Sequence, residues 1–321
     1  GDVCLESDWN NSLQVLGIEG EIEKNGSSPL VFTGYYEPKD KVSPLNIKAT
    51  LKNLELAILS EFISEDVLKL SGLANGEIDI TGKLESPQLE GLVIPTDGAV
   101  YIKYLNTQYK ILGPCGIYPD MFTFNNIDMG DQEGNMGKLT GTIMHKDFAE
   151  WNFDVIIDLP RRMLAMNTNS LMNPLYYGKA YTSGSVSIFG LAEQLEFDIH
   201  LRSEAGTKLS MPMGETGELS FENFIRFIDV DEPVVDEEMD LSGIKMNFEL
   251  EITPDAEFQI IFDEAIGDVI TGRGRGNILM DINTLSTFRM FGGVELLEGN
   301  YLFTLKNLIY KDFDLKPGGT I

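Results

Sequence analysis

Apolar residues occupy every second position in many short segments of this chain, with polar or acidic residues between them. Gly76–Gly82 reads GEIDITG, Phe248–Thr253 reads FELEIT and Tyr301–Lys306 reads YLFTLK. Successive side chains of a β-strand point to opposite faces, so each segment predicts a strand with one apolar and one polar face. The pattern predicts an all-β fold in which a whole sheet has a continuous apolar face. Such a face must pack against another sheet, close into a barrel, or be used for binding.

The predicted strands are separated by short connections that carry Gly, Asn, Asp or Pro. Before the acidic run near residue 235 they are Leu30–Tyr36, Asn46–Leu51, Gly76–Leu84, Ala99–Tyr104, Lys138–Met144, Asn152–Leu159, Gly184–Phe189 and Gln194–Arg202. After it they are Lys245–Thr253, Glu257–Phe262, Gly276–Asn283, Thr287–Met290, Val294–Leu297 and Asn300–Lys306.

Two segments instead have apolar residues at helical spacing, which predicts one or two short helices. They are Leu54–Leu70 and the shorter Phe221–Val230. Asp229–Asp240 is the densest acidic run, but it lacks the spacing and central Gly of a calcium-binding hand, so we expect a solvated loop. This loop divides the predicted sheet into an N-terminal part, residues 1–228, and a C-terminal part, residues 241–321.

Charge and composition exclude several classes of function. The chain has 51 acidic and 24 basic residues, a net charge of −27, which disfavours binding to nucleic acid and to anionic lipid surfaces. It has no run of 18 apolar residues, and it starts at Gly1 without Met, so we expect it to be part of a longer polypeptide. Cys4 and Cys115 permit one disulfide but lack metal spacing, and His200 falls on the polar side of its strand.

Motifs for catalysis are missing from the sequence. Neither Ser nor Cys stands in a nucleophile elbow, and His145 and His200 lack metal-ligand spacing. Gly272–Gly276 (GRGRG) opens a strand rather than a helix, so it is not a phosphate loop, and we expect Arg273 and Arg275 to be exposed turn residues. We therefore predict no enzyme activity, no cofactor and no metal.

Several longer strings resemble the C-terminal region of TamB, a family of the AsmA-like superfamily. They are Gly76–Tyr109 with its Ser86-Pro87 turn, Asn167–Met213, Ile252–Met280 and Phe288–Ile321. The resemblance covers nearly the whole chain past Asn46, and the family's pattern continues beyond the position of Ile321 into a Trp- and Pro-containing strand.

The resemblance implies a periplasmic protein of Gram-negative envelopes, anchored at the inner membrane by a helix outside this stretch. It implies a partner in an outer-membrane barrel of the TamA type. It also implies an elongated, curled, taco-like half-pipe with an apolar interior groove, in a family linked to phospholipid movement and outer-membrane protein assembly. About twenty strands at ~4.8 Å spacing would make such a sheet about 100 Å long.

The first functional hypothesis is a conduit in which phospholipid acyl chains lie along the apolar face, at about 0.8 kcal/mol per buried CH₂. The side chains predicted to line this lipid groove are Ile78, Ile80, Leu84, Val100, Ile102, Tyr104, Val186, Ile188, Leu195, Phe197, Ile199, Leu201, Phe248, Leu250, Ile252, Phe258, Ile260, Phe262, Ile278, Met280, Ile282, Phe288, Met290, Tyr301, Phe303 and Leu305.

Three alternatives use the same residues. A scaffold or chaperone would hold nascent strands of outer-membrane proteins in the groove or at a sheet edge. A packed sandwich with walls about 10 Å apart would leave no room for lipid. An outer-membrane barrel has strands of about 9–11 residues, and most predicted segments are shorter.

Overall fold

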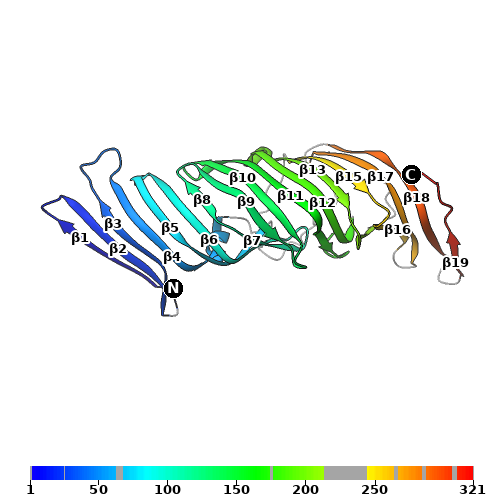
Figure 1. The fold of residues 1–321 in the computed structure, drawn as a ribbon, viewed down its shortest axis with the longest axis horizontal. Helices are drawn as coiled ribbons and strands as arrows, with labels where there is room; N and C mark the ends of the chain where they lie inside the picture. Colours follow the sequence, from blue (N-terminus) through cyan, green and yellow to red (C-terminus); the bar gives the residue numbers. More distant parts are fainter. Residues whose placement is uncertain are drawn as a thin grey trace, which may run out of the picture.

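The structure is a computed structural model that describes residues 2–24, 26–62, 68–173, 176–212, 244–263, 267–283, 287–305 and 309–320. These residues form nineteen strands of one extended sheet (Figure 1). The strands are β1 (Asp2–Asn10), β2 (Val15–Lys24), β3 (Ser27–Tyr36), β4 (Leu45–Glu55), β5 (Leu68–Lys83), β6 (Ser86–Ile102), β7 (Thr107–Leu112), β8 (Cys115–Tyr118), β9 (Met121–Gly130), β10 (Met136–Lys146), β11 (Ala149–Thr168), β12 (Tyr177–Leu191), β13 (Glu196–Ser203), β14 (Lys208–Pro212), β15 (Lys245–Ile252), β16 (Glu257–Asp263), β17 (Asp268–Asn283), β18 (Thr287–Leu305) and β19 (Ile309–Asp314). The all-β prediction is confirmed.

Neighbouring strands in the sheet are mostly neighbours in the sequence. β1 to β6 pair in order, β6 then pairs with both β7 and β8, and these two strands both pair with β9. The order continues from β9 through β13, and from β17 to β19, and all these pairs are antiparallel. The strands therefore follow one another along the long axis, from β1 in blue to β19 in red (Figure 1).

Two parallel pairings interrupt this pattern. β13 and β14 lie end to end against β12, β15 and β16 lie end to end against β17, and β13 pairs with β15 while β14 pairs with β16. The pairings of these six strands thus close a small ring, β12–β13–β15–β17–β16–β14. Buried hydroxyls seal the two breaks: Ser203 Oγ accepts from the Thr253 amide at 2.9 Å, and Thr207 Oγ1 accepts from the Tyr181 amide at 3.0 Å.

The long helix predicted over Leu54–Leu70 is wrong. Strand β4 continues to Glu55, a 3₁₀ helix follows over Leu56–Phe62, and β5 has already begun at Leu68. Both ends of the segment belong to strands of the sheet, because Leu54 pairs with Ala74 and Leu68 pairs with Ile102. The local preference for a helix, which the spacing of apolar residues indicated, is weaker than the strand pairing at both ends. A second 3₁₀ helix spans Ala192–Gln194, and the helix predicted at Phe221–Val230 lies outside the described residues.

The strands are longer than the sequence predicted. β11 has 20 residues, and β18 is one strand where three short ones were predicted. Strand length therefore carries no argument about fold class. Gly272–Gly276 lies inside β17 rather than before a strand, so Arg273 and Arg275 are strand residues and the predicted turn is wrong.

The acidic run Asp229–Asp240 lies outside the described residues, so the division of the chain at this run remains a prediction. Strands from both sides of it pair within the same sheet, since β13 precedes the run and β15 follows it. Among the helices of the described residues, none combines the length and apolar character needed to cross a membrane.

Candidate functional site

The pairing register shows which residues share a face of the sheet, because directly paired residues of neighbouring strands project to the same side. Ile78 of β5 pairs with Ala49 of β4 and with Gly91 of β6. Farther along, Ile199 of β13 pairs with Val186 of β12 and with Phe248 of β15. We call the side that carries Ile78 and Ile199 the apolar face, and following the register from β5 through β9, β10 and β11 to β13 keeps to this one side.

Most residues that the sequence predicted as groove-lining lie on this face. The register places there Ile78, Ile80, Val100, Ile102, Val186, Ile188, Phe197, Ile199, Leu201, Phe248, Leu250, Ile252, Phe258, Ile260, Ile278, Met280, Ile282, Met290, Tyr301 and Phe303. The side chains of Phe288 and Leu305 lie outside the described part of the chain, so their place in the groove remains a prediction. Phe262 stands at a bulge of β16, and its ring lies 6.1 Å from that of Tyr301.

Three of the predicted residues lie outside the strands. Leu84 and Tyr104 occupy the β5–β6 and β6–β7 connections, where they are 60% and 56% exposed. Leu195 directly precedes β13, and its carbonyl oxygen accepts a hydrogen bond from the amide of Lys245 at 2.9 Å. The structure does not bring these three side chains into the rows formed by the other residues.

Strand β15 shows how burial differs between the two faces of the sheet. In β15, the side chains of Met246, Phe248 and Leu250 are partly buried, while their neighbours Asn247 and Glu249 are exposed. Inner side chains of a two-layer sandwich are nearly inaccessible. The partial burial of the apolar side chains of β15 is the amount expected when only neighbouring strands of the same layer cover them.

Strands β1 to β3 and β9 to β11 contribute further residues to this face, and none of them was predicted as groove-lining from the sequence. In β1, Val3 and Leu5 are 69% and 64% exposed and alternate with Asp2, Cys4 and Glu6. The register adds the following residues: Val3, Leu5, Trp9, Ile18, Ile22, Leu30, Phe32, Phe122, Phe124, Ile143, Phe153 and Val155. The alternation in DVCLESDW was a usable signal for β1.

The sheet bends sharply toward its apolar face near the middle of the chain. The hydroxyl of Tyr109 on β7 donates to the carbonyl oxygen of Leu164 on β11 at 2.9 Å, and the Asn167 amide donates to the Leu105 carbonyl oxygen at 2.9 Å. Beneath these contacts lies a buried cluster of apolar-face residues: Tyr109, Met129, Leu159 and Met163. Burial raises the pKa of the Tyr109 hydroxyl.

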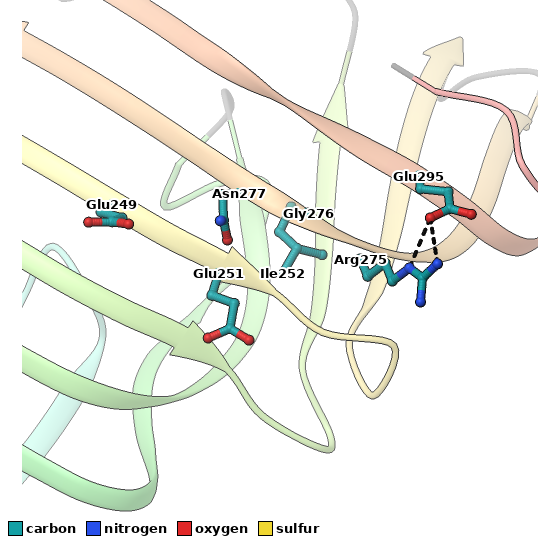
Figure 2. Close-up of a pocket in the computed structure, with 7 residues that line it drawn as sticks. All are labelled: Glu249, Glu251, Ile252, Arg275, Gly276, Asn277 and Glu295. Carbon is teal, nitrogen blue, oxygen red and sulfur yellow. Dashed lines mark hydrogen bonds and ion pairs between the residues drawn. The ribbon is translucent and has the colours of Figure 1, made fainter.

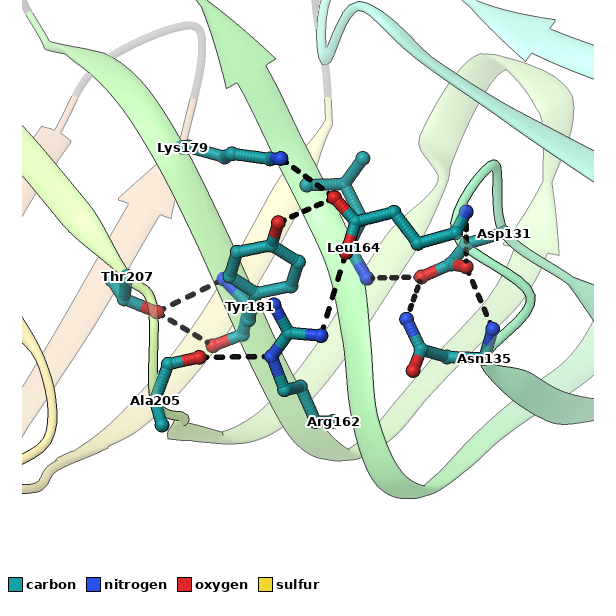
Figure 3. Close-up of polar contacts among 9 residues, drawn as sticks. Asp131, Asn135, Arg162, Leu164, Lys179, Tyr181, Ala205 and Thr207 are labelled. Carbon is teal, nitrogen blue, oxygen red and sulfur yellow. Dashed lines mark hydrogen bonds and ion pairs between the residues drawn. The ribbon is translucent and has the colours of Figure 1, made fainter.

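Polar side chains hold the outer side of this bend (Figure 3). Asp131 in the β9–β10 turn accepts from the amide of Leu164 at 2.8 Å and from the amide of Asn135 at 2.8 Å. In the same turn, Glu133 accepts from Lys179 at 2.6 Å and from the Tyr181 hydroxyl, and these two hydrogen bonds hold the pKa of Glu133 below its usual value. This cluster joins the turn to β12 and is structural.

Arg162 lies between the same elements. Its guanidinium lies 3.5 Å from the centroid of the Tyr181 ring, and its Nε donates to the carbonyl oxygen of Ala205 at 2.8 Å. The contacts fix the β13–β14 connection against β11.

The polar face carries charge-paired strands and a shallow depression (Figure 2). The depression is lined by Glu249, Glu251, Ile252, Arg275, Gly276, Asn277 and Glu295. Arg275 pairs with Glu295 at 2.9 Å, and Arg273 pairs with Glu257 at 3.4 Å, so both arginines already have carboxylate partners. In the described part of the chain, no three His, Cys, Asp or Glu side chains are grouped so that they could hold a metal ion.

The two histidines and two cysteines lie apart. His200 is on the polar face, as predicted, between Glu249 at 3.0 Å and Asp198 at 3.3 Å. His145 is buried against Phe122, Phe148 and Trp151. Cys4 and Cys115 are both free thiols.

The comparison with protein families decides the identity of this sheet. The TamB C-terminal domain family matches residues 125–321, from β9 to the end of the chain. This chain belongs to the TamB family. TamB is a cell-envelope protein of the translocation and assembly module, which it forms with TamA. No curated protein and no solved structure matches the chain.

Proposed function

We propose that the apolar face of this TamB-family sheet shields phospholipid acyl chains as lipid moves through the periplasm between the inner and the outer membrane. The observation that carries the proposal is the face of mainly apolar side chains that runs from β1 to β19, many of them only partly buried. A soluble monomer normally exposes apolar patches of at most several hundred Å². An apolar strip across nineteen strands needs an occupant, and acyl chains match it in chemistry.

Glycines on the apolar face support a curved groove. At Gly184, whose φ is +130°, an added Cβ would lie 2.0 Å from the carbonyl oxygen of His200 on the next strand. The same close approach, at 2.0–2.2 Å, occurs at these apolar-face glycines: Gly34, Gly76, Gly91, Gly141, Gly178, Gly276 and Gly292. Glycine kinks bend strands where a side chain would clash, so this row favours a sheet that is concave toward its apolar face. The Tyr109–Leu164 contact bends the sheet in the same direction.

The energetics fit a conduit. Each buried CH₂ contributes about 0.8 kcal/mol, so a single acyl chain along the face is held by several kcal/mol. Apolar side chains follow one another from strand to strand, so an acyl chain that slides along the face exchanges one apolar contact for another. The acidic opposite face, with a net charge of −27 over the chain, keeps the loaded sheet soluble.

The test is a pair of adjacent substitutions on β15. Phe248→Glu places a charge on the apolar face, and Asn247→Glu places the same charge on the polar face one residue away. Native mass spectrometry of protein purified from bacterial envelopes should show co-purified phospholipid with the wild type and with Asn247→Glu, and at least tenfold less with Phe248→Glu. Circular dichroism controls for the fold. Equal lipid content in two folded variants would refute the proposal.

A scaffold for nascent β-strands is the second candidate, and the exposure of β1 favours it. All nine residues of β1 are exposed, and within the described residues this strand pairs only with β2. A sheet edge binds further strands through backbone hydrogen bonds. If the protein is a scaffold, Phe248→Glu should abolish its lipid content in cells and leave outer-membrane protein assembly unchanged. If it is a conduit alone, the same substitution should abolish lipid content and also impair assembly, because the supply of lipid to the outer membrane fails.

A further inference from the structure

The apolar face carries two charged side chains at its C-terminal end. Lys311 of β19 pairs with Phe303 of β18, which places it on this face. Asp268, the first residue of β17, is hydrogen-bonded through its carboxylate to the hydroxyl of Tyr301, another apolar-face residue. Wherever the described strands from β1 to β16 pair without a bulge, the apolar face carries no Asp, Glu, Lys or Arg. Asp268 and Lys311 therefore depart from the pattern of the rest of the apolar face, which indicates a local role for these two charges.

Four aromatic rings surround this end of the face. The ring of Tyr301 lies 6.1 Å from that of Phe262, 6.1 Å from that of Phe303 and 6.2 Å from that of Phe313. The ammonium group of Lys311 lies 4.8 Å from the centroid of Phe313. Aromatic rings attract cations, so rings and a carboxylate together suit a cationic group.

Neither charge is fully used by the protein. One oxygen of Asp268, Oδ1, is inaccessible to solvent and has no hydrogen-bond partner among the described residues. Within that same part of the chain, no carboxylate lies in ion-pair distance of Lys311. A buried carboxylate oxygen without a partner costs free energy, which a ligand with a hydrogen-bond donor would recover.

We propose that Asp268, Lys311 and the rings of Phe262, Tyr301, Phe303 and Phe313 form a headgroup subsite for a zwitterionic phospholipid with an ammonium group. The ammonium group pairs with Asp268 among the rings, and the phosphate pairs with Lys311. The register puts Phe303 between the two charged residues, so their backbones are separated by two strand spacings, about 10 Å. The Lys311 side chain spans part of this distance, and a phosphate-to-ammonium headgroup spans the rest. A purely anionic headgroup would leave Asp268 without a cationic partner, and the two negative charges would repel each other.

This inference rests on the proposed function, because it names the class of lipid that the apolar face carries. The test offers the protein an equimolar mixture of phosphatidylethanolamine and phosphatidylglycerol with identical acyl chains and counts bound lipids by native mass spectrometry. The wild type should prefer phosphatidylethanolamine by about threefold to tenfold. Asp268→Asn should remove the preference and keep the total number of bound lipids. Lys311→Gln should lower the binding of both lipids.

The matched control is Asp281→Asn, which removes a carboxylate from the polar face of the same strand β17. It should leave both the amount and the preference unchanged. Equal binding of the two lipids by the wild type, or a preference that survives Asp268→Asn, would overturn the headgroup subsite and leave the conduit standing. Failure of the wild type to bind either lipid would overturn the conduit itself, and the subsite with it.

Discussion

The hydroxyl of Tyr109 on β7 donates to the carbonyl oxygen of Leu164 on β11 at 2.9 Å, although β9 and β10 lie between these strands in the sheet. In a flat sheet three strand spacings would separate the two residues by about 14 Å. The contact therefore requires a sharp bend. Leu164 stands at an irregularity of β11, where side chains satisfy its backbone: Asp131 accepts from its amide, and Tyr109 donates to its carbonyl.

Removing the Tyr109 hydroxyl should destabilise the protein. Tyr109→Phe keeps the ring in its buried cluster but leaves the Leu164 carbonyl oxygen, in a residue only 2% exposed, without its donor. The expected loss is about 1–3 kcal/mol of the free energy of unfolding, measured by chemical denaturation. Tyr310→Phe, at a 63% exposed tyrosine, is the control and should change stability by less than about 0.5 kcal/mol. An equal loss in both variants would show that the Tyr109 contact is not what holds the bend.

The sequence predicted the faces of the sheet better than its length or its bends. Alternation has a period of two, so Phe248, Leu250 and Ile252 had to share a side wherever β15 paired. The same alternation could not reveal that Thr287–Met290, Val294–Leu297 and Asn300–Lys306 are one strand, because glycines between them look like turns. Only the pairing with β17 across Gly292 and Gly293 shows that the strand continues.

Other features depend on contacts that no local pattern encodes. The segment after Leu54 has apolar residues at helical spacing, yet pairing of Leu54 and Leu68 with distant strands determined its ends. The strand breaks near Ser203 and Thr253 fall where predicted strands end, but the parallel pairs β13–β15 and β14–β16 join segments far apart in the sequence, which alternation cannot reveal. Asp268 was not predicted as a site residue, because a lone carboxylate next to Gly267 reads as a turn.

Substituting a glycine of the apolar face should be far more damaging than substituting a turn glycine. Gly184→Ala places a methyl group 2.0 Å from the His200 carbonyl oxygen, so the two strands must separate. We expect a loss of more than about 2 kcal/mol in the free energy of unfolding. Gly26→Ala is the control: its φ is also positive, at +76°, but nothing lies within 4 Å, and it should cost about 1 kcal/mol. Similar losses in both variants would mean that backbone conformation alone, and not the close approach of strands, fixes Gly184.

The two thiols should differ strongly in reactivity. Cys4 is exposed, whereas burial raises the pKa of the Cys115 thiol to about 11. At pH 8 only about one Cys115 in a thousand is then a thiolate, the form that reacts. Iodoacetamide at pH 8 should modify Cys4 within minutes and leave Cys115 intact until denaturant is added, as read by peptide mass spectrometry. Equal labelling of both cysteines in the folded protein would contradict the burial of Cys115.

His200 should make a small, pH-dependent contribution to stability. Its hydrogen bond to Glu249, with a further contribution from Asp198, raises the pKa of the imidazole above its usual value. A raised pKa means that the contribution is fully present below the unfolded-state pKa and is lost as the pH rises through the folded-state pKa. The site is exposed, so the contribution is only a few tenths of a kcal/mol. His200→Gln should therefore lower the melting temperature slightly at pH 5.5 and leave it unchanged at pH 8.5, and the opposite order would be inconsistent with these ion pairs.

The most direct test of the apolar face as the lipid path is a photo-crosslinking scan along β15. A photoreactive amino acid is placed, one position at a time, at residues 246 to 251 of the protein in bacterial envelopes, and lipid adducts are counted by mass spectrometry after illumination. Adducts should form at Met246, Phe248 and Leu250 and be nearly absent at Asn247, Glu249 and Glu251, a period of two that follows the partly buried side chains. Adducts spread evenly over both faces, or confined to the polar positions, would contradict the proposed lipid path.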